Sequence, residues 1–512
     1  MKKRLLILTT LLASASAAMA GGLQHNGNQS AEYIRMLSRS GSTHADAIFY
    51  NPAGMALFND GFTISLNNQI PWQTREISCD YPNLQMGTVN GKYEGKVFSA
   101  LFPGIYAAYK KNSWAFSLGF NPIGGGGASV FKDGLPMLEA PLSTVAQMAG
   151  ATAYSADTRL EGFSIYYGFQ ANAAYKINDM FSVAVGLRFV DARNTYDGYM
   201  NNIQFNTGAD GAMVMANAHY GTLAAQAAGA VAALSDLNAT SGSASMAAVI
   251  TGADAATQLA LNAIVAGMPT YDPATSKVSD VYSYYATASA NAAKVAGATQ
   301  DLALETSQHG AGFTPILGFN FHYEKLNIGI RYEFMTKIML TNDTKKDVMS
   351  MFPDGKKTRS DLPAVLSAGA EYMLLPNLRL SGTYTYYFDK DASYGEARSP
   401  YVDKNTWEIG LGAEYGITEK LLVSAGYQFT KYNVLDAYET DLTQALSNST
   451  FGFGGAYKFN DIVKLNLGAL YTVNEDRKVP QATVIDGLPT LSYNTTYGRH
   501  TFTLAFGVDL TF

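Results

Sequence analysis

The side chains that could support metal or covalent chemistry are few and scattered along the 512 residues. Cys79 is the only cysteine, so the chain cannot form an internal disulfide. Six histidines occur, none in a His-x-x-x-His pair or beside the cysteine. They are His25, His44, His219, His309, His322 and His500. We therefore expect no metal centre, no cofactor and no enzymatic activity.

Two arginines are candidates for binding the carboxylate of a ligand. Arg188 and Arg331 each lie in the polar phase of an alternating apolar stretch. If these stretches are strands of a barrel, both guanidinium groups face the lumen near mid-height, two strands apart. A guanidinium can hold a carboxylate through two hydrogen bonds. The alternative is an ion pair with an N-terminal segment or with Glu333, Glu408 or Glu414.

The composition restricts what kind of protein could carry these side chains. Hydrophobic residues make up 47% of the chain and charged residues 15%, against about 25% charged in soluble domains. The net charge of -6 argues against a nucleic-acid partner. After the first twenty residues no apolar run approaches the ~18 residues of a spanning helix. If the chain crosses a membrane, it does so with strands.

The N-terminus has the pattern of a secretory signal peptide, predicted to span residues 1–20. Lys2, Lys3 and Arg4 form its basic region, and an apolar stretch follows. The sequence Ala18-Met19-Ala20 fits a cleavage site. We therefore expect an exported protein.

Apolar and polar residues alternate in repeated segments of about ten residues, the length of a tilted strand in an outer-membrane barrel. In the last segment, Phe502, Leu504 and Phe506 alternate with small or polar residues. The predicted strands lie near 62–75, 97–109, 114–121, 161–176, 181–194, 313–323, 326–340, 363–373, 378–388, 406–415, 421–432, 450–459, 463–474 and 499–512. This pattern predicts an all-β protein, a transmembrane antiparallel β-barrel of 14 strands over residues 61–512.

The connections between these segments alternate between short and long. Bacterial outer-membrane barrels have short periplasmic turns and long outer loops, and an even number of strands. A soluble β-sandwich also alternates, but the low charge, the even count and the terminal Phe512 favour the barrel.

The longest connection, an insertion over residues 205–312, differs in composition from the rest. Residues 211–300 contain 28 alanines, and apolar residues recur there at helical spacing. We predict short helices on the outer surface, broken near Thr240–Ser245 and Pro269–Pro273. The alternative is a flexible low-complexity loop.

Residues 21–60 precede the first strand and lack clean alternation. They are too few to form a domain, and a barrel of this size leaves an open lumen, so we predict that they fill it as a hatch. A short helix is expected around Tyr33–Leu37. A turn is expected at Asn51, Pro52, Ala53 and Gly54, because Asn-Pro starts turns and glycine permits a close backbone approach.

A second interruption falls after the third predicted strand. It consists of Asn121, Pro122, Gly124, Gly125, Gly126 and Gly127. Proline lacks the N–H that a strand ladder requires, and the glycines have no side chains to pack. We predict a kinked strand here; a glycine-rich outer loop is the alternative.

Taken together, these features resemble the FadL/TodX family of outer-membrane transporters of hydrophobic compounds. The resemblance rests on the signal peptide, the Asn51-Pro52-Ala53-Gly54 turn, Phe120-Asn121-Pro122-Ile123-Gly124, Leu362-Pro363-Ala364 and the terminal Phe512. It covers nearly the whole chain except the alanine-rich insertion. It implies a lumenal hatch, apolar binding sites above it, and a lateral opening at the kinked strand. Phe512 is similar to the signal by which the outer-membrane insertion machinery takes up barrel proteins.

The sequence therefore predicts passive uptake of hydrophobic molecules, long-chain fatty acids first, across the bacterial outer membrane, with lateral release into the lipid. A monomer without a cofactor is expected. The alternatives are a surface adhesin or structural barrel, a haem-type receptor using the long outer loop, and a diffusion porin. A porin would need no plug, which residues 21–60 argue against.

Overall fold

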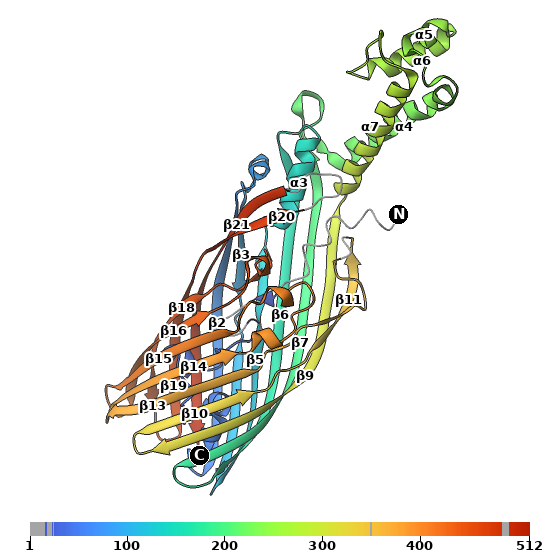
Figure 1. Ribbon diagram of the computed structural model, residues 1–512. Coiled ribbons are helices and arrows are strands. Elements are labelled where there is room, and N and C mark those ends of the chain that lie inside the picture. Colours follow the sequence, from blue (N-terminus) through green and yellow to red (C-terminus); the bar gives the residue numbers. More distant parts are fainter. Residues whose placement is uncertain (1–15, 18–22, 24, 349–350, 484–490) are drawn as a thin grey trace.

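The computed structural model describes residues 16–17, 23, 25–348, 351–483 and 491–512. Within them, fourteen antiparallel strands close into one barrel (Figure 1). These are β2 (Gly61–Cys79), β4 (Pro103–Lys111), β5 (Trp114–Phe131), β6 (Tyr154–Lys176), β7 (Phe181–Phe205), β9 (Leu302–Tyr323), β10 (Leu326–Glu333), β13 (Val365–Leu375), β14 (Leu378–Tyr387), β15 (Thr406–Gly416), β16 (Leu421–Lys431), β18 (Asn448–Lys458), β19 (Val463–Asn474) and β21 (Leu491–Thr511). The predicted fold class and strand number are confirmed. The predicted signal peptide lies outside the described residues except for Ser16 and Ala17.

The barrel closes because its first and last strands pair along their whole length. β2 and β21 are antiparallel from Thr63 opposite Thr511 to Cys79 opposite Thr495. At the end of the chain, the amide of Phe62 donates to the carbonyl of Phe512 (3.1 Å) and the amide of Phe512 to that of Phe62 (2.9 Å). Phe512 therefore completes the ladder and leaves no free edge. Its predicted role as an assembly signal stays a prediction.

The alternation sorts side chains to the two faces of the wall as expected. On β21, Phe506 is 51% exposed on the outside, whereas Thr503 and Ala505 are buried inside. On β10, Ile330 points outward, and Arg331 points inward. Large apolar side chains are exposed on the outer face of every strand of the barrel, which suits a wall that spans a membrane.

The two ends of the barrel differ. Tight turns and the C-terminus lie at one end, and the long connections lie at the other (Figure 1). The long end carries several short elements: β3 (Lys92–Phe98), β8 (Val214–Met215), β11 (Met339–Asp347), β12 (Lys357–Arg359), β17 (Thr443–Gln444), which pairs with β1 (Ser16–Ala17), β20 (Arg477–Thr483), η2 (Pro82–Met86), η3 (Ala209–Gly211), η4 (Asp389–Asp391), η5 (Ser399–Tyr401), η6 (Asp436–Tyr438) and α3 (Pro136–Met148).

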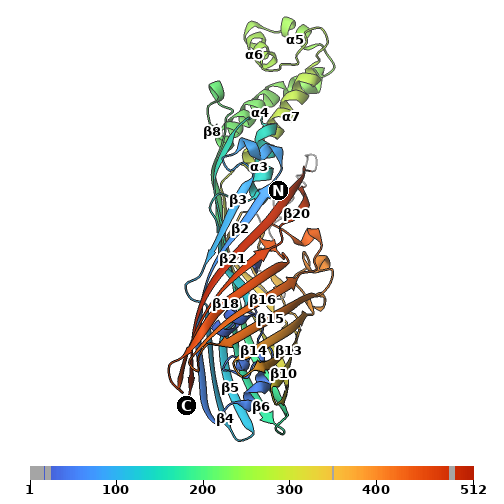
Figure 2. The same cartoon turned by 90° about the vertical axis from the view of Figure 1, so that its left-hand side faces the viewer.

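The alanine-rich insertion projects beyond the barrel (Figure 2). It forms four helices, α4 (Ala216–Ser241), α5 (Met246–Gly252), α6 (Ala255–Ala266) and α7 (Val278–Ala298). Two of the three breaks between these helices lie where the sequence predicts them, and the break between α5 and α6 was not predicted. Helices α4 and α7 are long and pack side by side, and their small residues allow close approach. No helix in the described residues is apolar and long enough to cross a membrane.

Two predicted strands are divided in the structure. The second is split into β3 and β4 at 99–102, and the seventh into β10 and β11 at 334–338. At both breaks the inward-facing residues change from odd to even numbers, so each side alternates but in a different phase, and the prediction joined the two runs into one strand.

Protease added to intact cells should cut the chain within residues 211–300 and spare the turn at 177–180. The reason is that the insertion extends from the end opposite the short turns, which we place in the periplasm. Blotting for the two fragments gives the measurement. Cleavage at 177–180 in intact cells would mean the opposite orientation.

Candidate functional site

The N-terminal segment, residues 25–60, lies inside the lower half of the barrel; we call it the hatch. It contains α1 (Ala31–Met36), α2 (Ala47–Tyr50) and η1 (Pro52–Leu57). The Ser30 hydroxyl caps α1 by accepting from the amide of Tyr33 (2.9 Å), and Leu37 ends it in the left-handed region. Nearly every hatch residue is buried. The structure thus places a short helix where the sequence predicts one.

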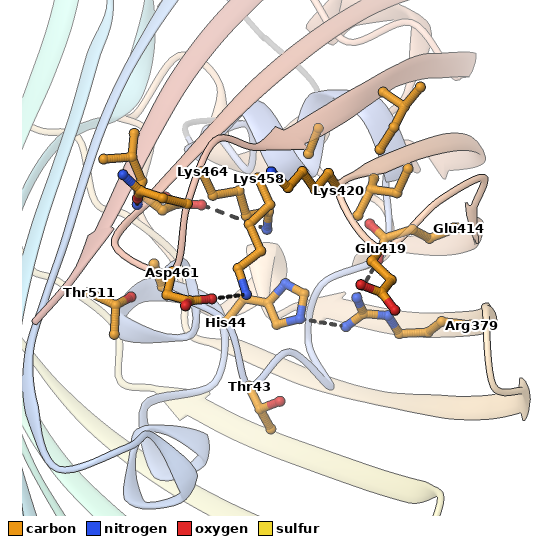
Figure 3. A pocket seen from close by; sticks show the side chains of 18 of the residues that line it. Thr43, His44, Arg379, Glu414, Glu419, Lys420, Lys458, Asp461, Lys464 and Thr511 are labelled. Atoms are coloured by element: carbon orange, nitrogen blue, oxygen red, sulfur yellow. Dashed lines mark hydrogen bonds and ion pairs between the residues drawn. The ribbon is translucent and has the colours of Figure 1, made fainter.

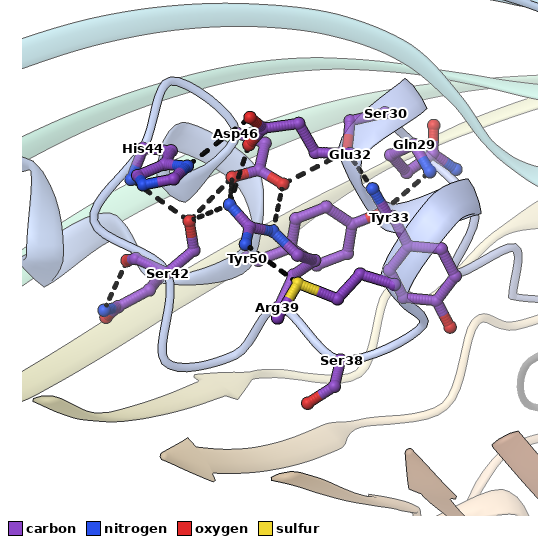
Figure 4. A network of polar contacts seen from close by, with 12 residues as sticks. Gln29, Ser30, Glu32, Tyr33, Ser38, Arg39, Ser42, His44, Asp46 and Tyr50 are labelled. Carbon is purple, nitrogen blue, oxygen red and sulfur yellow. Dashed lines mark hydrogen bonds and ion pairs between the residues drawn. The ribbon is translucent and has the colours of Figure 1, made fainter. Parts of the chain in front are cut away.

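A buried ion-pair network holds the hatch in its fold (Figure 4). Its centre is Arg39, whose guanidinium lies 2.7 Å from Glu32, 2.8 Å from Asp46 and 3.1 Å from Glu371 of β13. Asp46 also accepts from the hydroxyl of Ser42 (2.7 Å). Burial would raise the pKa of Glu32, but Lys464, Arg39 and His44 hold it well below the ordinary value. Glu32 therefore stays ionised near neutral pH.

Further ion pairs tie the hatch to the wall. Arg35 lies 2.5 Å from Glu414 of β15 and donates to Ser424 of β16 (2.9 Å). Lys464 of β19 pairs with Glu32. These contacts join α1 to β15, β16 and β19, and each brings together residues far apart in the sequence.

The wall accommodates the hatch with glycines that face the lumen. A Cβ on Gly426 would lie 2.0 Å from the Met36 carbonyl oxygen, and one on Gly452 would lie 2.4 Å from that of Ile34. On β10, β13, β15, β16, β18, β19 and β21, an added Cβ would lie 3.0 Å or less from a hatch atom at nine glycines, which we call the glycine belt: Gly329, Gly369, Gly410, Gly412, Gly426, Gly452, Gly454, Gly468 and Gly507. The sequence analysis did not predict that lumen-facing glycines make room for the hatch. The recurrence of glycine in the inward phase of the strands was a visible signal for it.

The predicted turn at Asn51–Gly54 lies in the lumen against β7 and β9. The side-chain amide of Asn51 donates to the carbonyl of Ser42 (2.9 Å) and to Asn320 of β9 (2.7 Å). The hydroxyl of Ser182 of β7 donates to the carbonyl of Ala53 (2.8 Å). A Cβ on Gly54 would lie 2.5 Å from Asn51 Nδ2, so only glycine fits here. Pro52 begins η1, buried like its neighbours.

The predicted kink is an interruption on one side of β5. Toward β6 the strand continues to Phe131 with register shifts between Pro122 and Gly124 and between Gly124 and Gly127. Toward the other side, β4 pairs only as far as Phe120, and β3 pairs again at 130–131. Among the described residues, no strand pairs with the β3/β4 side of residues 121–129. Ile123 is the extra residue at the first shift, and Gly125 and Gly126 lie at the second. Gly125 has φ +82°, and a Cβ there would lie 2.4 Å from the carbonyl oxygen of Ser164.

The start of the hatch occupies this interruption. His25 forms an antiparallel bridge with Gly124, and the amide of Asn26 donates to the carbonyl of Ile123 (2.7 Å). The side-chain amides of Asn26 and Gln29 both donate to the carbonyl of Pro122 (3.2 and 2.8 Å). The side chain of Asn121 is fully buried, with no hydrogen-bond partner for either polar atom among the described residues. The hatch and the kinked strand are thus one unit.

Both arginines selected from the sequence are paired inside the lumen. Arg188 lies 2.6 Å from Glu333 and also donates to Gln170 (2.9 Å). Arg331 lies 3.2 Å from Glu333 and donates to the carbonyl of Phe49 in the hatch. Both guanidinium groups stand over the Phe49 ring, about 5 Å from its centroid. The alternative interpretation, ion pairing, describes these contacts, and the ligand role stays a prediction.

The lumen below the hatch is a wide polar vestibule of about 790 Å³ at the end with the short turns (Figure 3). Its lining includes His44, Arg379, Lys420, Lys458 and Lys464. His44 bridges the vestibule and the buried network, 2.8 Å from Arg379 and 3.4 Å from Glu32. Burial and the neighbouring Arg379 lower its pKa.

An apolar cluster lies above the hatch. A buried cluster joins the outer parts of β2, β5, β7 and β21 to α3. Its members include Ile77, Tyr93, Phe131, Leu138, Leu142, Leu446 and Tyr497. Asp441, in the loop between β16 and β18, accepts from the amide of Met137 at the start of α3 (2.7 Å) and ties that loop to the helix. The barrel thus holds an apolar cluster above the hatch and a charged vestibule below it.

The comparisons with known proteins support the fold. A Pseudomonas aeruginosa FadL homologue superposes with a TM-score of 0.60 at 13% identity, covering 96% of this chain and 100% of its own. The Pseudomonas putida toluene transporter TodX superposes with a TM-score of 0.52 at 12% identity, covering 96% and 100%. No protein-family model and no curated protein matches the sequence. The resemblance expected from the sequence is confirmed at the level of the fold.

Proposed function

We propose that this chain is an outer-membrane channel for the passive uptake of hydrophobic molecules, long-chain fatty acids in particular, with release sideways into the lipid through the interruption at β5. Ligand enters from the end that carries α3, binds in the apolar part of the lumen, and leaves when the hatch withdraws from β5. No covalent chemistry is required.

The observation that carries this proposal is the unpaired side of β5. A closed barrel normally hydrogen-bonds every strand on both sides, because lipid cannot satisfy backbone groups. Here residues 121–129 lack a partner strand on one side, and the hatch residues His25, Asn26 and Gln29 bind there from within. Movement of the hatch is therefore coupled to opening of the wall.

The direction of transport follows from the polarity of the lumen. Burial of an alkyl chain is worth about 0.8 kcal/mol per methylene, so the apolar cluster above the hatch favours long chains. The charged vestibule below the hatch does not favour them, and lipid lies immediately outside β5. The proposed path therefore leads from the apolar cluster to the bilayer. The similarity to FadL and TodX barrels agrees with this path.

A reversible disulfide between the hatch and β5 tests the proposal. His25→Cys with Gly124→Cys, in a Cys79→Ser background, joins bridge partners whose Cα atoms lie about 4.5–5.5 Å apart in antiparallel pairs, within the range of a disulfide. We expect uptake of radiolabelled oleate by cells to stop when the pair is oxidised and to return on reduction, because the hatch can no longer leave the wall.

The matched control is Thr450→Cys with Thr472→Cys, a lumen-facing pair of neighbours on β18 and β19 whose hydroxyls lie 2.9 Å apart. That disulfide should form without changing uptake. Full oleate uptake by the oxidised His25/Gly124 variant would contradict release through β5.

A further inference from the structure

Helix α3 covers the outer end of the apolar cluster. It follows β5 and lies at the end of the barrel that carries the insertion (Figure 1). Ten of its thirteen residues are buried, although it belongs to a connection and not to the wall. Leu138 and Leu142 of the helix share the cluster with Ile77 of β2, Leu160 of β6 and Leu304 of β9. The helix therefore packs against several strands at once and lies over the lumen.

Two buried carboxyl groups flank the first turn of α3. Glu139, in that turn, is 5% exposed and accepts from the hydroxyl of Tyr154 on β6 (2.7 Å). Asp441 is also 5% exposed, and it accepts from the amide of Met137 (2.7 Å) and from the hydroxyl of Tyr497 on β21 (2.9 Å). All of these donors are uncharged, so they do not neutralise either acid.

The basic side chains beside α3 are paired with other acids. Arg159 of β6, which lines a small cleft against the helix, lies 2.6 Å from Glu161. Arg477 of β20 lies 3.2 Å from Glu439, on the same loop as Asp441. Within the described part of the chain, no ion pair joins either carboxyl group of the α3 turn to a basic side chain.

The other titratable groups around the two acids supply no positive charge to them. Tyr93 of β3 faces both acids, and Cys79 of β2 faces Asp441. Tyr81, just before η2, is hydrogen-bonded to α3 (2.8 Å). Tyrosine and cysteine are neutral near pH 7. Asp133, in the loop before the helix, adds negative charge near Glu139, and Lys294 of α7 is exposed to solvent.

Burial raises the pKa of both carboxyl groups. The pKa of Asp441 rises to about 6, because desolvation outweighs the hydrogen bonds from Met137 and Tyr497, which favour the ionised form. Burial likewise raises the pKa of Glu139. If α3 moved and water reached the acids, both would return to their ordinary pKa of about 4. The closed arrangement thus binds protons more tightly than an open one, so rising pH favours opening.

We propose that α3 is a pH-sensitive lid over the outer mouth of the lumen, closed while Glu139 and Asp441 are protonated and released when they ionise. The effect of the lid on uptake rests on the proposed function, because ligand enters at this end, whereas its movement does not. Between pH 5 and pH 8, Asp441 alone should lower the ratio of closed to open lid about tenfold, and Glu139 acts in the same direction.

The distance between two spin labels, measured by double electron–electron resonance, reports the position of α3. Met148→Cys places one label at the exposed end of the helix, and Lys96→Cys places the other on the outer face of β3. Cys79→Ser removes the native thiol. For the full chain in lipid nanodiscs, we expect one distance at pH 5 and a second population at pH 8, because ionised acids leave the buried site.

Glu139→Gln with Asp441→Asn keeps both side chains neutral and should show the pH 5 distribution at both pH values. Uptake of radiolabelled dodecanol, an uncharged probe, should then be slower at pH 8 than in wild type. The matched control is Asp389→Asn, because Asp389 is also buried and accepts from an uncharged donor, Tyr394 (2.7 Å), but lies in η4 on another loop. The control should respond to pH as wild type does, and the heat-modifiable gel shift checks the folding of each variant.

Several outcomes would overturn the lid. The inference fails if the distance distribution of wild type does not change with pH, if the response persists in the double variant, or if Asp389→Asn abolishes it. It also fails if α3 moves as expected but the double variant takes up dodecanol as wild type does at both pH values. If α3 moves as expected and wild type takes up no dodecanol at either pH, the proposed function is wrong and the moving lid remains.

Discussion

Replacing Arg39 by methionine should detach the hatch and convert the plugged barrel into an ion-conducting pore. The substitution leaves Glu32, Asp46 and Glu371 buried without the cation that pairs with all three. Breaking a buried ion pair by removing one partner costs about 3–5 kcal/mol. The backbone hydrogen bonds between the strands do not involve the Arg39 side chain, so the cost falls on the docking of the hatch rather than on the barrel.

Conductance of single channels in planar bilayers measures this effect. The variant should keep the heat-modifiable gel shift of a folded barrel while its conductance rises well above that of wild type. Arg193→Met is the matched control, because this arginine is also ion-paired but its side chain is 64% exposed. Wild-type conductance in the Arg39 variant would mean that the hatch does not seal the lumen.

Placing a charge at the middle of the outer face should give the second large effect, on the stability of the barrel. Phe506 is 51% exposed on β21 and lies roughly 15 Å from the C-terminal end, allowing for strand tilt. Phe506→Arg should cost about 2–4 kcal/mol, because a guanidinium at the bilayer midplane loses its hydration. A urea titration of folding into lipid vesicles gives the free energy of unfolding.

The control for depth is Phe62→Arg. Phe62 is 54% exposed and lies beside the C-terminus at the edge of the barrel, where an arginine costs only about 0–1 kcal/mol. If both variants lost the same free energy of unfolding, the apolar outer face would not be held at a fixed depth in lipid. The assignment of the outer face to lipid would then fail.

The arginines of the lumen show how far residue type alone can be interpreted. Arg188 and Arg331 could be selected because each falls in the inward, polar phase of an alternating strand. Both share Glu333, one of the partners considered in the sequence analysis. Arg75 and Arg499 occupy the same inward phase, but nothing local marks them as neighbours. Their proximity depends on which strands meet when the barrel closes.

The sequence by itself determined most of the strands and the faces on which their side chains lie. Alternation is a local property, since successive side chains of a strand point to opposite faces wherever the strand lies. Phe506 and Thr503 could therefore be assigned to opposite faces without knowing which strands pair with theirs. Pro122 and the glycines after it likewise marked the kink, because a missing N–H and missing side chains act at the residue itself.

Only the tertiary structure decided which of these local features meet. The pairing of β2 with β21 places Arg75 opposite Arg499, the glycine belt receives α1, and His25 bridges to Gly124. Each contact joins segments that are distant in sequence, and each depends on the register of the whole barrel. A shift by one residue in any strand pairing would turn a lumen-facing side chain toward lipid, so the register, and with it the contents of the lumen, is set by the packing of all fourteen strands and the hatch together.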